Sequence, residues 1–181
     1  MDPVVRIGAA PRVLDNDVRT GWLYSVAAAI GVRIDERIDV RAEARFERSR
    51  ADRAQPLVRG ISGAAYDLDS AALSLVADYM LTRATVVSFG YTYRNGDVVS
   101  STRRNRAIFG VSDAIARDPA FGPDIVAYRL DAHSHVVEAR VSHALGERTS
   151  ANIGVGRSFT YGDGGNNYYG TSVTASLLYN F

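Results

Sequence analysis

The chain has 181 residues and a mass of 19.6 kDa, so we expect a single domain over residues 1–181. Its 21 basic and 20 acidic residues leave a net charge of +1, so no overall field attracts nucleic acid. The absence of cysteine excludes a disulfide scaffold, a thiolate metal site and a cysteine nucleophile. The hydrophobic content of 46% excludes a disordered chain, and no uninterrupted apolar run approaches the roughly 20 residues of a membrane-spanning helix.

Apolar and polar residues alternate along most of the chain, which is the pattern of β-strands with one apolar face. The first long example covers 21–34, and after a short polar stop at 35–37 a second covers 38–50, which predicts a hairpin. The same period of two continues to the last residue. The chain therefore predicts an all-β fold with eight strands, at about 4–12, 21–34, 38–50, 67–81, 84–95, 125–145, 149–161 and 168–181.

The connections between these strands alternate between short and long. Short and long turns therefore lie at opposite ends of the sheet, which is typical of transmembrane barrels and is not expected of a soluble sandwich. The pattern predicts a transmembrane antiparallel up-and-down β-barrel with both chain ends on the short-turn side. The short connections are 35–37, 81–83 and 146–148, and the long polar ones are 51–66, 96–124 and 162–167.

The longest connection contains two local signals. Asn95-Gly96 favours a hairpin turn and leaves open an alternative layout with a further strand over 97–111. The arginine-rich block at 103–106 opposes a lipid-facing strand, so we expect a loop. Within this loop, 112–118 is predicted to form a short surface helix capped by its first serine.

Aromatic residues gather near the loop ends of several predicted strands. Such a distribution is typical of the aromatic girdle of a membrane protein, although aromatic residues also favour strands in general. The residues concerned are Trp22, Tyr24, Tyr91, Tyr93, Phe159, Tyr161, Tyr168 and Tyr169.

The final segment, Val173 to Phe181, alternates apolar residues and ends in an aromatic residue. With eight amphipathic strands and sorted turn lengths, it resembles the bacterial outer-membrane β-barrel family, in particular the small eight-stranded OmpA/OmpX-like type. The resemblance implies an outer-membrane location, contact with outer-membrane lipid, and a signal read by the barrel-insertion machinery. We read Met1 as the start of a chain whose export signal was removed, and a larger parent barrel truncated before Met1 stays an alternative. The residues of the implied assembly signal are Val173, Ala175, Leu177, Tyr179 and Phe181.

Charged residues occupy the inward positions once the apolar face is assigned outward. Arginine facing lipid at mid-depth costs about 2–4 kcal/mol, whereas opposite charges inside a narrow barrel can pair. The equal numbers of both signs favour a salt-bridged plug over an ion pathway. The predicted lumen network consists of Arg6, Arg33, Asp39, Arg41, Glu43, Arg45, Glu47, Asp78, Glu138 and Arg140.

Two short fragments resemble the catalytic groups of the omptin outer-membrane proteases: Asp67-Leu68-Asp69 and Asp131-Ala132-His133. The omptin barrel has ten strands and a longer chain, and regular alternation turns the second fragment outward. The histidines give neither a lipid A deacylase pair nor a complete metal site. We therefore expect no catalytic residue, no metal and no cofactor.

The expected function is a non-enzymatic outer-membrane barrel that acts as a membrane scaffold or surface-interaction module. Loop arginines suit contacts with the phosphates of lipopolysaccharide, or with a protein partner, although ordinary solvated loop charges explain them equally. The alternatives are a porin or channel, the C-terminal part of a larger transport barrel, and an omptin-like surface protease. The arginines concerned are Arg50, Arg53, Arg59, Arg103, Arg104 and Arg106.

Overall fold

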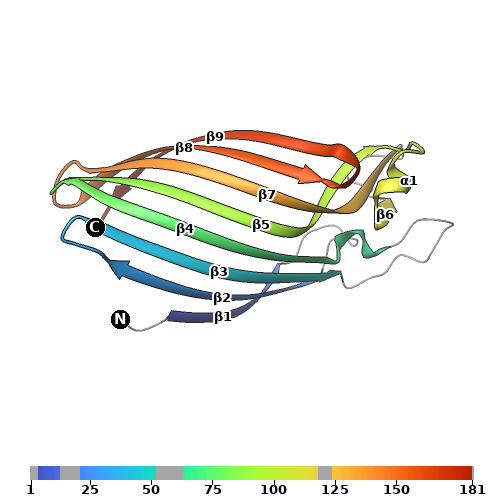
Figure 1. The fold of residues 1–181 in the computed structure, drawn as a ribbon, viewed down its shortest axis with the longest axis horizontal. Helices are drawn as coiled ribbons and strands as arrows, with labels where there is room; N and C mark the ends of the chain where they lie inside the picture. The colour runs from blue at the N-terminus through green and yellow to red at the C-terminus, as the bar shows by residue number, and fades with distance from the viewer. Residues whose placement is uncertain (1–3, 13–20, 52–62, 118–123, 181) are drawn as a thin grey trace.

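The computed structural model describes residues 4–12, 21–51, 63–117 and 124–180, and these form one antiparallel sheet (Figure 1). Eight strands follow one another in chain order, each hydrogen-bonded to the next, so the predicted all-β up-and-down topology is confirmed. No helix in the described ranges is both long and apolar enough to cross a membrane. The strands are β1 (Val4–Arg12), β2 (Gly21–Arg33), β3 (Ile38–Ala51), β4 (Leu68–Thr82), β5 (Thr85–Arg103), β7 (Ile125–Ala144), β8 (Thr149–Gly162) and β9 (Asn166–Tyr179).

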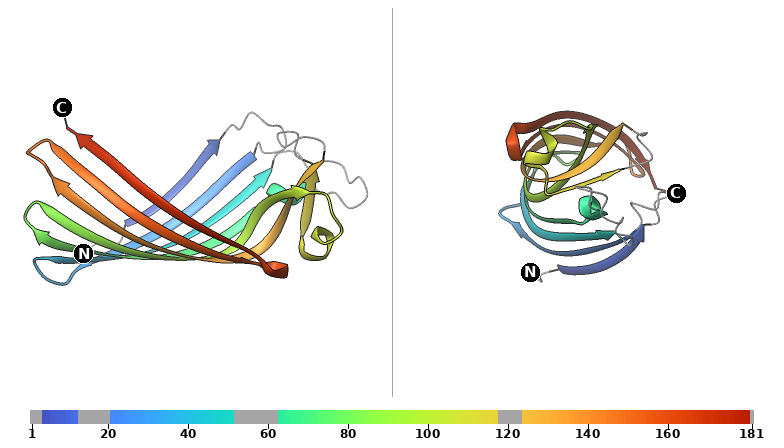
Figure 2. Two further views of the ribbon diagram at one scale, coloured as in Figure 1. Left: turned by 90° about the horizontal axis from the view of Figure 1, so that it is seen from above. Right: turned by 90° about the vertical axis from the view of Figure 1, so that its right-hand side faces the viewer.

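The sheet curls into an incomplete ring, with β1 and β9 at its two edges (Figure 2). Within the described residues no backbone pairing joins these two edges. The start of β1 and the end of β9 lie at the same end of the sheet as the short turns (Figure 1). The short turns are tightly bonded; for example, the Asp35 carboxylate accepts the backbone N–H of Arg37 at 2.7 Å and of Ile38 at 2.8 Å. The three short connections that the sequence predicts are thus present at this end.

The two faces of the sheet differ in composition and burial. In β2, β4 and β8 the apolar positions are the exposed ones, while the alternating small and polar positions are less exposed. Side chains on the concave side of a curled sheet shield one another, so the polar face is the concave one. The apolar face carries side chains that are 45% to 76% exposed, namely Val26, Ile30, Val32, Leu73, Leu75, Phe89, Val137, Val141, Ile153, Val155, Val173 and Leu177.

The buried core lies at the loop end instead of along the strands. There the ends of β5 and β7 meet three short elements: η1 (Gly63–Tyr66), α1 (Ile108–Val111) and β6 (Ala114–Arg117). One cluster surrounds Leu130, which is fully buried, and a second packs Ala65 against β6. We call these elements the loop-end cap. The buried apolar residues of the described ranges thus lie in the cap, whereas the large apolar side chains along the strands are exposed.

The structure corrects three sequence predictions, the first of them in the region between β5 and β7. The predicted helix over 112–118 is wrong, because 114–117 forms β6, and the helical turn lies earlier at 108–111. β8 pairs with β7 only as far as Ala132, and β6 takes the next free stretch of the β7 edge. Pairing these backbone groups outweighs local helix propensity.

The hairpin alternative at Asn95-Gly96 is also wrong. β5 continues through this dipeptide to Arg103 and pairs with β7 throughout. Gly96 has a φ of +135°, and a Cβ there would lie 2.2 Å from the carbonyl oxygen of Asp69. The glycine therefore permits a close approach of two strands and does not form a turn.

Finally, the expected long connection at 162–167 is a three-residue turn, η3 (Asp163–Gly165), with Gly164 and Gly165 at positive φ.

Candidate functional site

Aromatic side chains bound the apolar face at both of its ends. On β9, Tyr169 and Tyr179 mark the two limits, ten residues apart. This separation corresponds to about 33 Å along a strand, and to about 25 Å across a bilayer at the usual strand tilt. We call the region between these limits the apolar band. The loop-end limit consists of Trp22, Tyr24, Tyr91, Tyr93, Phe159, Tyr161 and Tyr169, and the turn-end limit of Tyr79 and Tyr179.

One residue of the predicted girdle lies elsewhere. Tyr168 is on the polar face, where its hydroxyl donates to the Ser100 hydroxyl at 2.8 Å and lies 3.4 Å from the hydroxyl of Tyr128. Its assignment to the girdle is therefore wrong, since neighbouring residues of a strand point to opposite faces.

Two histidines join the loop-end aromatic limit. The His133 ring stacks on Tyr161 with centroids 5.3 Å apart, and the His135 ring lies 5.3 Å from Tyr93. The Tyr91 hydroxyl is hydrogen-bonded to His135 Nδ1 at 2.8 Å. Each ring combines an apolar body with a polar edge, which suits a boundary between apolar and aqueous surroundings.

The polar face contains the predicted charge network only in part. Arg33 pairs with Asp39 at 2.9 Å, and Arg45 pairs with Glu43 at 2.8 Å and with Glu47 at 3.6 Å. Four further members have no ion pair within the described residues, and the side chain of Arg6 lies outside them. These four members are Arg41, Asp78, Glu138 and Arg140.

Glycines lie directly opposite several charges of the polar face. Glu138 is paired in register with Gly90 on one side and Gly156 on the other, and Arg140 is paired with Gly154. A Cβ at Gly156 would lie 3.4 Å from Cγ of Glu138 and 2.7 Å from the Ser172 hydroxyl oxygen. The glycines therefore make room for long inward side chains, as expected where small and large residues alternate inside a narrow barrel. Sequence inspection missed this pairing because it depends on strand register.

A charged cluster fixes strands at the loop end, beyond the apolar band. The Asp69 carboxylate accepts hydrogen bonds from Arg48 and Arg50, each at 2.9 Å, and its backbone N–H donates to Asp97 at 2.7 Å. The hydrogen bonds from Arg50 and Arg48 lower the pKa of Asp69 to about 2. The cluster thereby connects β3, β4 and β5.

Three carboxylates approach one another nearby. Oxygens of Asp97, Asp113 and Asp131 lie within 4.8 Å of one another, and Nε of Arg129 is 3.7 Å from Asp97. Desolvation, followed by the charges of Asp113 and Asp97, raises the pKa of Asp131. Arg129 supplies one counter-charge to the cluster.

The two protease-like fragments have other partners. The Asp67 carboxylate accepts the backbone N–H of Ala51 at 2.8 Å, and Asp69 is held by its two arginines. His133 lies with aromatic rings on the apolar face, as alternation predicts. In this structure Asp69 is therefore the ion-pair partner of two arginines.

The predicted lipopolysaccharide arginines fall into three groups. Arg50 is paired with Asp69, whereas Arg53 and Arg59 lie outside the described residues. The remaining three are exposed at the loop end, and one of them stacks on the ring of Phe109 at 5.9 Å. These three residues are Arg103, Arg104 and Arg106.

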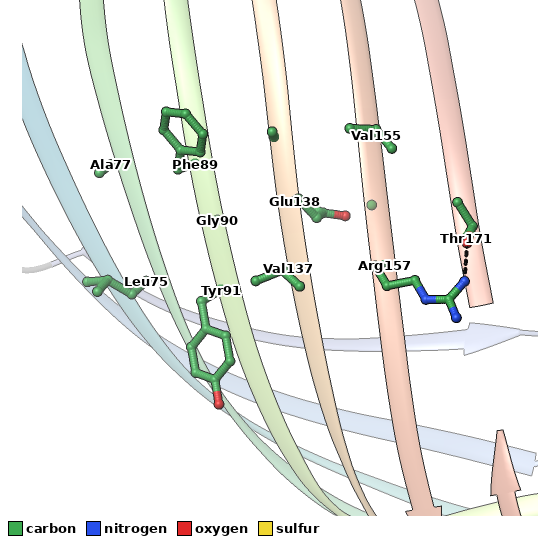
Figure 3. Close-up of a pocket in the computed structure, with 12 residues that line it drawn as sticks. Leu75, Ala77, Phe89, Gly90, Tyr91, Val137, Glu138, Val155, Arg157 and Thr171 are labelled. Atoms are coloured by element: carbon green, nitrogen blue, oxygen red, sulfur yellow. Dashed lines mark hydrogen bonds between the residues drawn. The ribbon is translucent and has the colours of Figure 1, made fainter. Parts of the chain in front are cut away.

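A groove of 560 Å³ crosses the apolar face over β4, β5, β7, β8 and β9 (Figure 3). Large side chains form its walls, and small residues keep it open between them. Its lining includes Leu75, Phe89, Tyr91, Val137 and Val155, with Ala77 and Ala139 between them, the glycines Gly90 and Gly156, and Arg157 and Thr171 at one end.

The apolar residues of the predicted assembly signal point to the same face as this groove. Val173, Ala175, Leu177 and Tyr179 are exposed on β9, and Phe181 lies outside the described residues.

Comparison of the chain with protein-family models, curated proteins and solved structures finds no match. The function is therefore argued from the faces of the sheet and the groups at its two ends.

Proposed function

We propose that the protein is a non-enzymatic transmembrane β-barrel of the bacterial outer membrane that acts as a membrane scaffold or a surface-interaction module. The apolar face carries this proposal. Its large side chains stay about half exposed and lie side by side across the strands, whereas soluble monomers rarely expose a large contiguous apolar surface. Hydrocarbon is the environment that matches this surface, and aromatic residues at both limits match the two interfaces.

Barrel closure belongs to the same proposal. An open sheet edge leaves unpaired N–H and C=O groups, which hydrocarbon does not tolerate. We infer that β1 and β9 pair with each other in the membrane. The unpaired edges favour a second candidate, a channel or transport barrel in which further strands complete the ring.

The ends of the sheet suggest an orientation and partners. Short turns are typical of the periplasmic side, which leaves the loop-end cap outside. There, exposed Arg103, Arg104 and Arg106 suit contacts with lipopolysaccharide phosphates or with a protein partner. On β9, the exposed apolar residues suit recognition by the barrel-insertion machinery. The omptin-like alternative is weaker because Asp69 is held by arginines.

Two adjacent substitutions on β8 test the proposal. Ile153 is 65% exposed near the middle of the apolar band, and Asn152 next to it lies on the polar face, where its amide donates to Ser176. In phospholipid vesicles, Ile153→Arg should lower the free energy of unfolding by about 2–4 kcal/mol, because its charge would face hydrocarbon. Asn152→Arg should change it by less than about 1 kcal/mol, since polar groups surround that site.

The measurement is urea unfolding of the full chain in vesicles, followed by circular dichroism and heat-modifiable gel mobility. Equal effects of the two substitutions would argue against a lipid-facing apolar surface. Failure of the wild-type chain to insert at all would refute the membrane proposal.

A further inference from the structure

The groove on the apolar face has a regular construction. One wall is a row of residues paired across the strands, including Tyr91, Val137 and Arg157. The other wall is the neighbouring row on the same face, two residues from the first row on each strand. In this second row, large Phe89 and Val155 alternate with small alanines. The alanines leave a cross-strand channel, and its volume of 560 Å³ is in the range of small-molecule sites.

Arg157 is the one cationic residue that lines this groove. Its side chain is exposed and donates to the Thr171 hydroxyl at 2.5 Å (Figure 3). The same side chain stacks on Phe159, with 5.5 Å from the guanidinium carbon to the ring centroid. No carboxylate of the described residues lies within ion-pair distance of it. Within the part of the chain that the structure describes, the positive charge at the end of this apolar groove therefore has no counter-ion.

The acidic residue nearest the groove does not neutralise Arg157. Glu138 lines the groove through its backbone region, but its carboxylate is on the polar face. A Cβ added to Gly90 would lie 3.9 Å from one carboxylate oxygen of Glu138, and a Cβ added to Gly156 would lie 3.6 Å from the other. Both glycines belong to the polar face. No carboxylate in the described ranges therefore serves as a counter-ion for Arg157.

We propose that this groove binds one anionic phospholipid, with an acyl chain along the groove and its phosphate on Arg157. The inference rests on the proposed membrane function and adds a specific ligand to it. Arg157 lies two residues inside Phe159 of the loop-end aromatic limit, so its long side chain reaches the headgroup level while its stem stays among apolar residues. Thr171 holds the guanidinium in place and leaves its other N–H groups for the phosphate.

Fluorescence quenching by brominated lipids tests this assignment. The full chain carries a single tryptophan, so Trp22→Phe combined with Phe89→Trp places the reporter in the groove wall. The protein is reconstituted in phosphatidylcholine bilayers in which either the phosphatidylcholine or added phosphatidylglycerol has brominated acyl chains. We expect phosphatidylglycerol to associate about fivefold more strongly at this reporter, the ratio that about 1 kcal/mol per cationic residue gives.

Two arginine variants provide the comparison. Arg157→Gln should reduce the preference to about onefold. Arg48→Gln is the matched control, because Arg48 also stacks on a phenylalanine of the same face but is neutralised by Asp69. That variant should retain the fivefold preference. A second reporter, Trp22→Phe with Ile30→Trp, monitors the apolar face of β2 and should report no preference.

The outcomes separate the lipid site from the membrane proposal. Quenching by both lipids without preference, or a preference that survives Arg157→Gln, would overturn the lipid site alone. Absence of quenching by either lipid would overturn both proposals, since the apolar face would not be in hydrocarbon. If Arg157→Gln does not fold, the two reporters decide: equal preference at Phe89→Trp and Ile30→Trp would reject a localised site.

Discussion

Asp69 links three strands at the loop end through its hydrogen bonds. Its side chain bonds two arginines of β3, and its backbone N–H bonds Asp97 of β5. Hydrogen bonds to the charged form favour ionisation, which accounts for its low pKa. Because Asp69 is partly exposed, solvent weakens the energetic effect of these pairs.

The protein should therefore lose stability in acid through Asp69. A folded-state pKa of about 2, below the ordinary value of 3.8, gives stability that is complete above about pH 4 and is lost as the pH falls towards 2. Between pH 5 and pH 2.5, urea unfolding in vesicles should show about 1 kcal/mol more loss for the wild type than for Asp69→Asn, after allowance for screening. Glu36→Gln, in an exposed turn, should behave as the wild type. An Asp69→Asn chain with the wild-type pH dependence would contradict the assignment.

Gly156 should be intolerant of even one added methyl group. An alanine Cβ there would lie 2.7 Å from the Ser172 hydroxyl oxygen, so Gly156→Ala should destabilise the protein by about 1–3 kcal/mol in urea unfolding. At Gly31, on the same face, a Cβ would meet only the Val40 carbonyl oxygen at 3.8 Å. Gly31→Ala should therefore be neutral or slightly stabilising. Equal losses for the two variants would mean that crowding by Ser172 is not what requires the glycine.

At the scale of elements, the strands were predictable and the cap was not. A period of two is a local signal, so seven of the eight predicted strands end within four residues of the observed limits, and β5 is the exception because it extends to Arg103. β6 forms because a free stretch of the β7 edge lies beside it, and this proximity arises only in the folded chain. Residues of the apolar face could likewise be read from alternation. Arg157 and its groove could not, because they require strand register.

The loop-end cap should depend on Leu130. This side chain is fully buried between the cap elements, so Leu130→Ala should cost about 2–5 kcal/mol through lost contacts and a cavity. Limited proteolysis should then cut within 104–124, whereas β5 and β7 on either side of this segment should stay protected. Leu145→Ala is the control: the side chain is 60% exposed in a turn at the opposite end, and its removal should leave cleavage unchanged. Unchanged protection in Leu130→Ala would mean that the cap is held by other contacts.

At the scale of the whole molecule, the polar face and the cap should together prevent conduction. A closed ring of eight strands has an interior that side chains can fill, and this face carries long paired charges. The purified protein should give no stable large-conductance steps in planar lipid bilayers. Reproducible ohmic channels of porin size would favour the channel or larger-barrel alternative.

The central claim is that the sheet spans a membrane with its short turns on one side and its cap on the other. Cysteine labelling on intact cells tests this directly, because the chain contains no cysteine of its own. An impermeant maleimide should label Asp163→Cys on intact cells, and should label Glu36→Cys and Glu147→Cys only after the outer membrane is permeabilised. Labelling of Glu36→Cys on cells with an intact outer membrane would contradict the proposed topology.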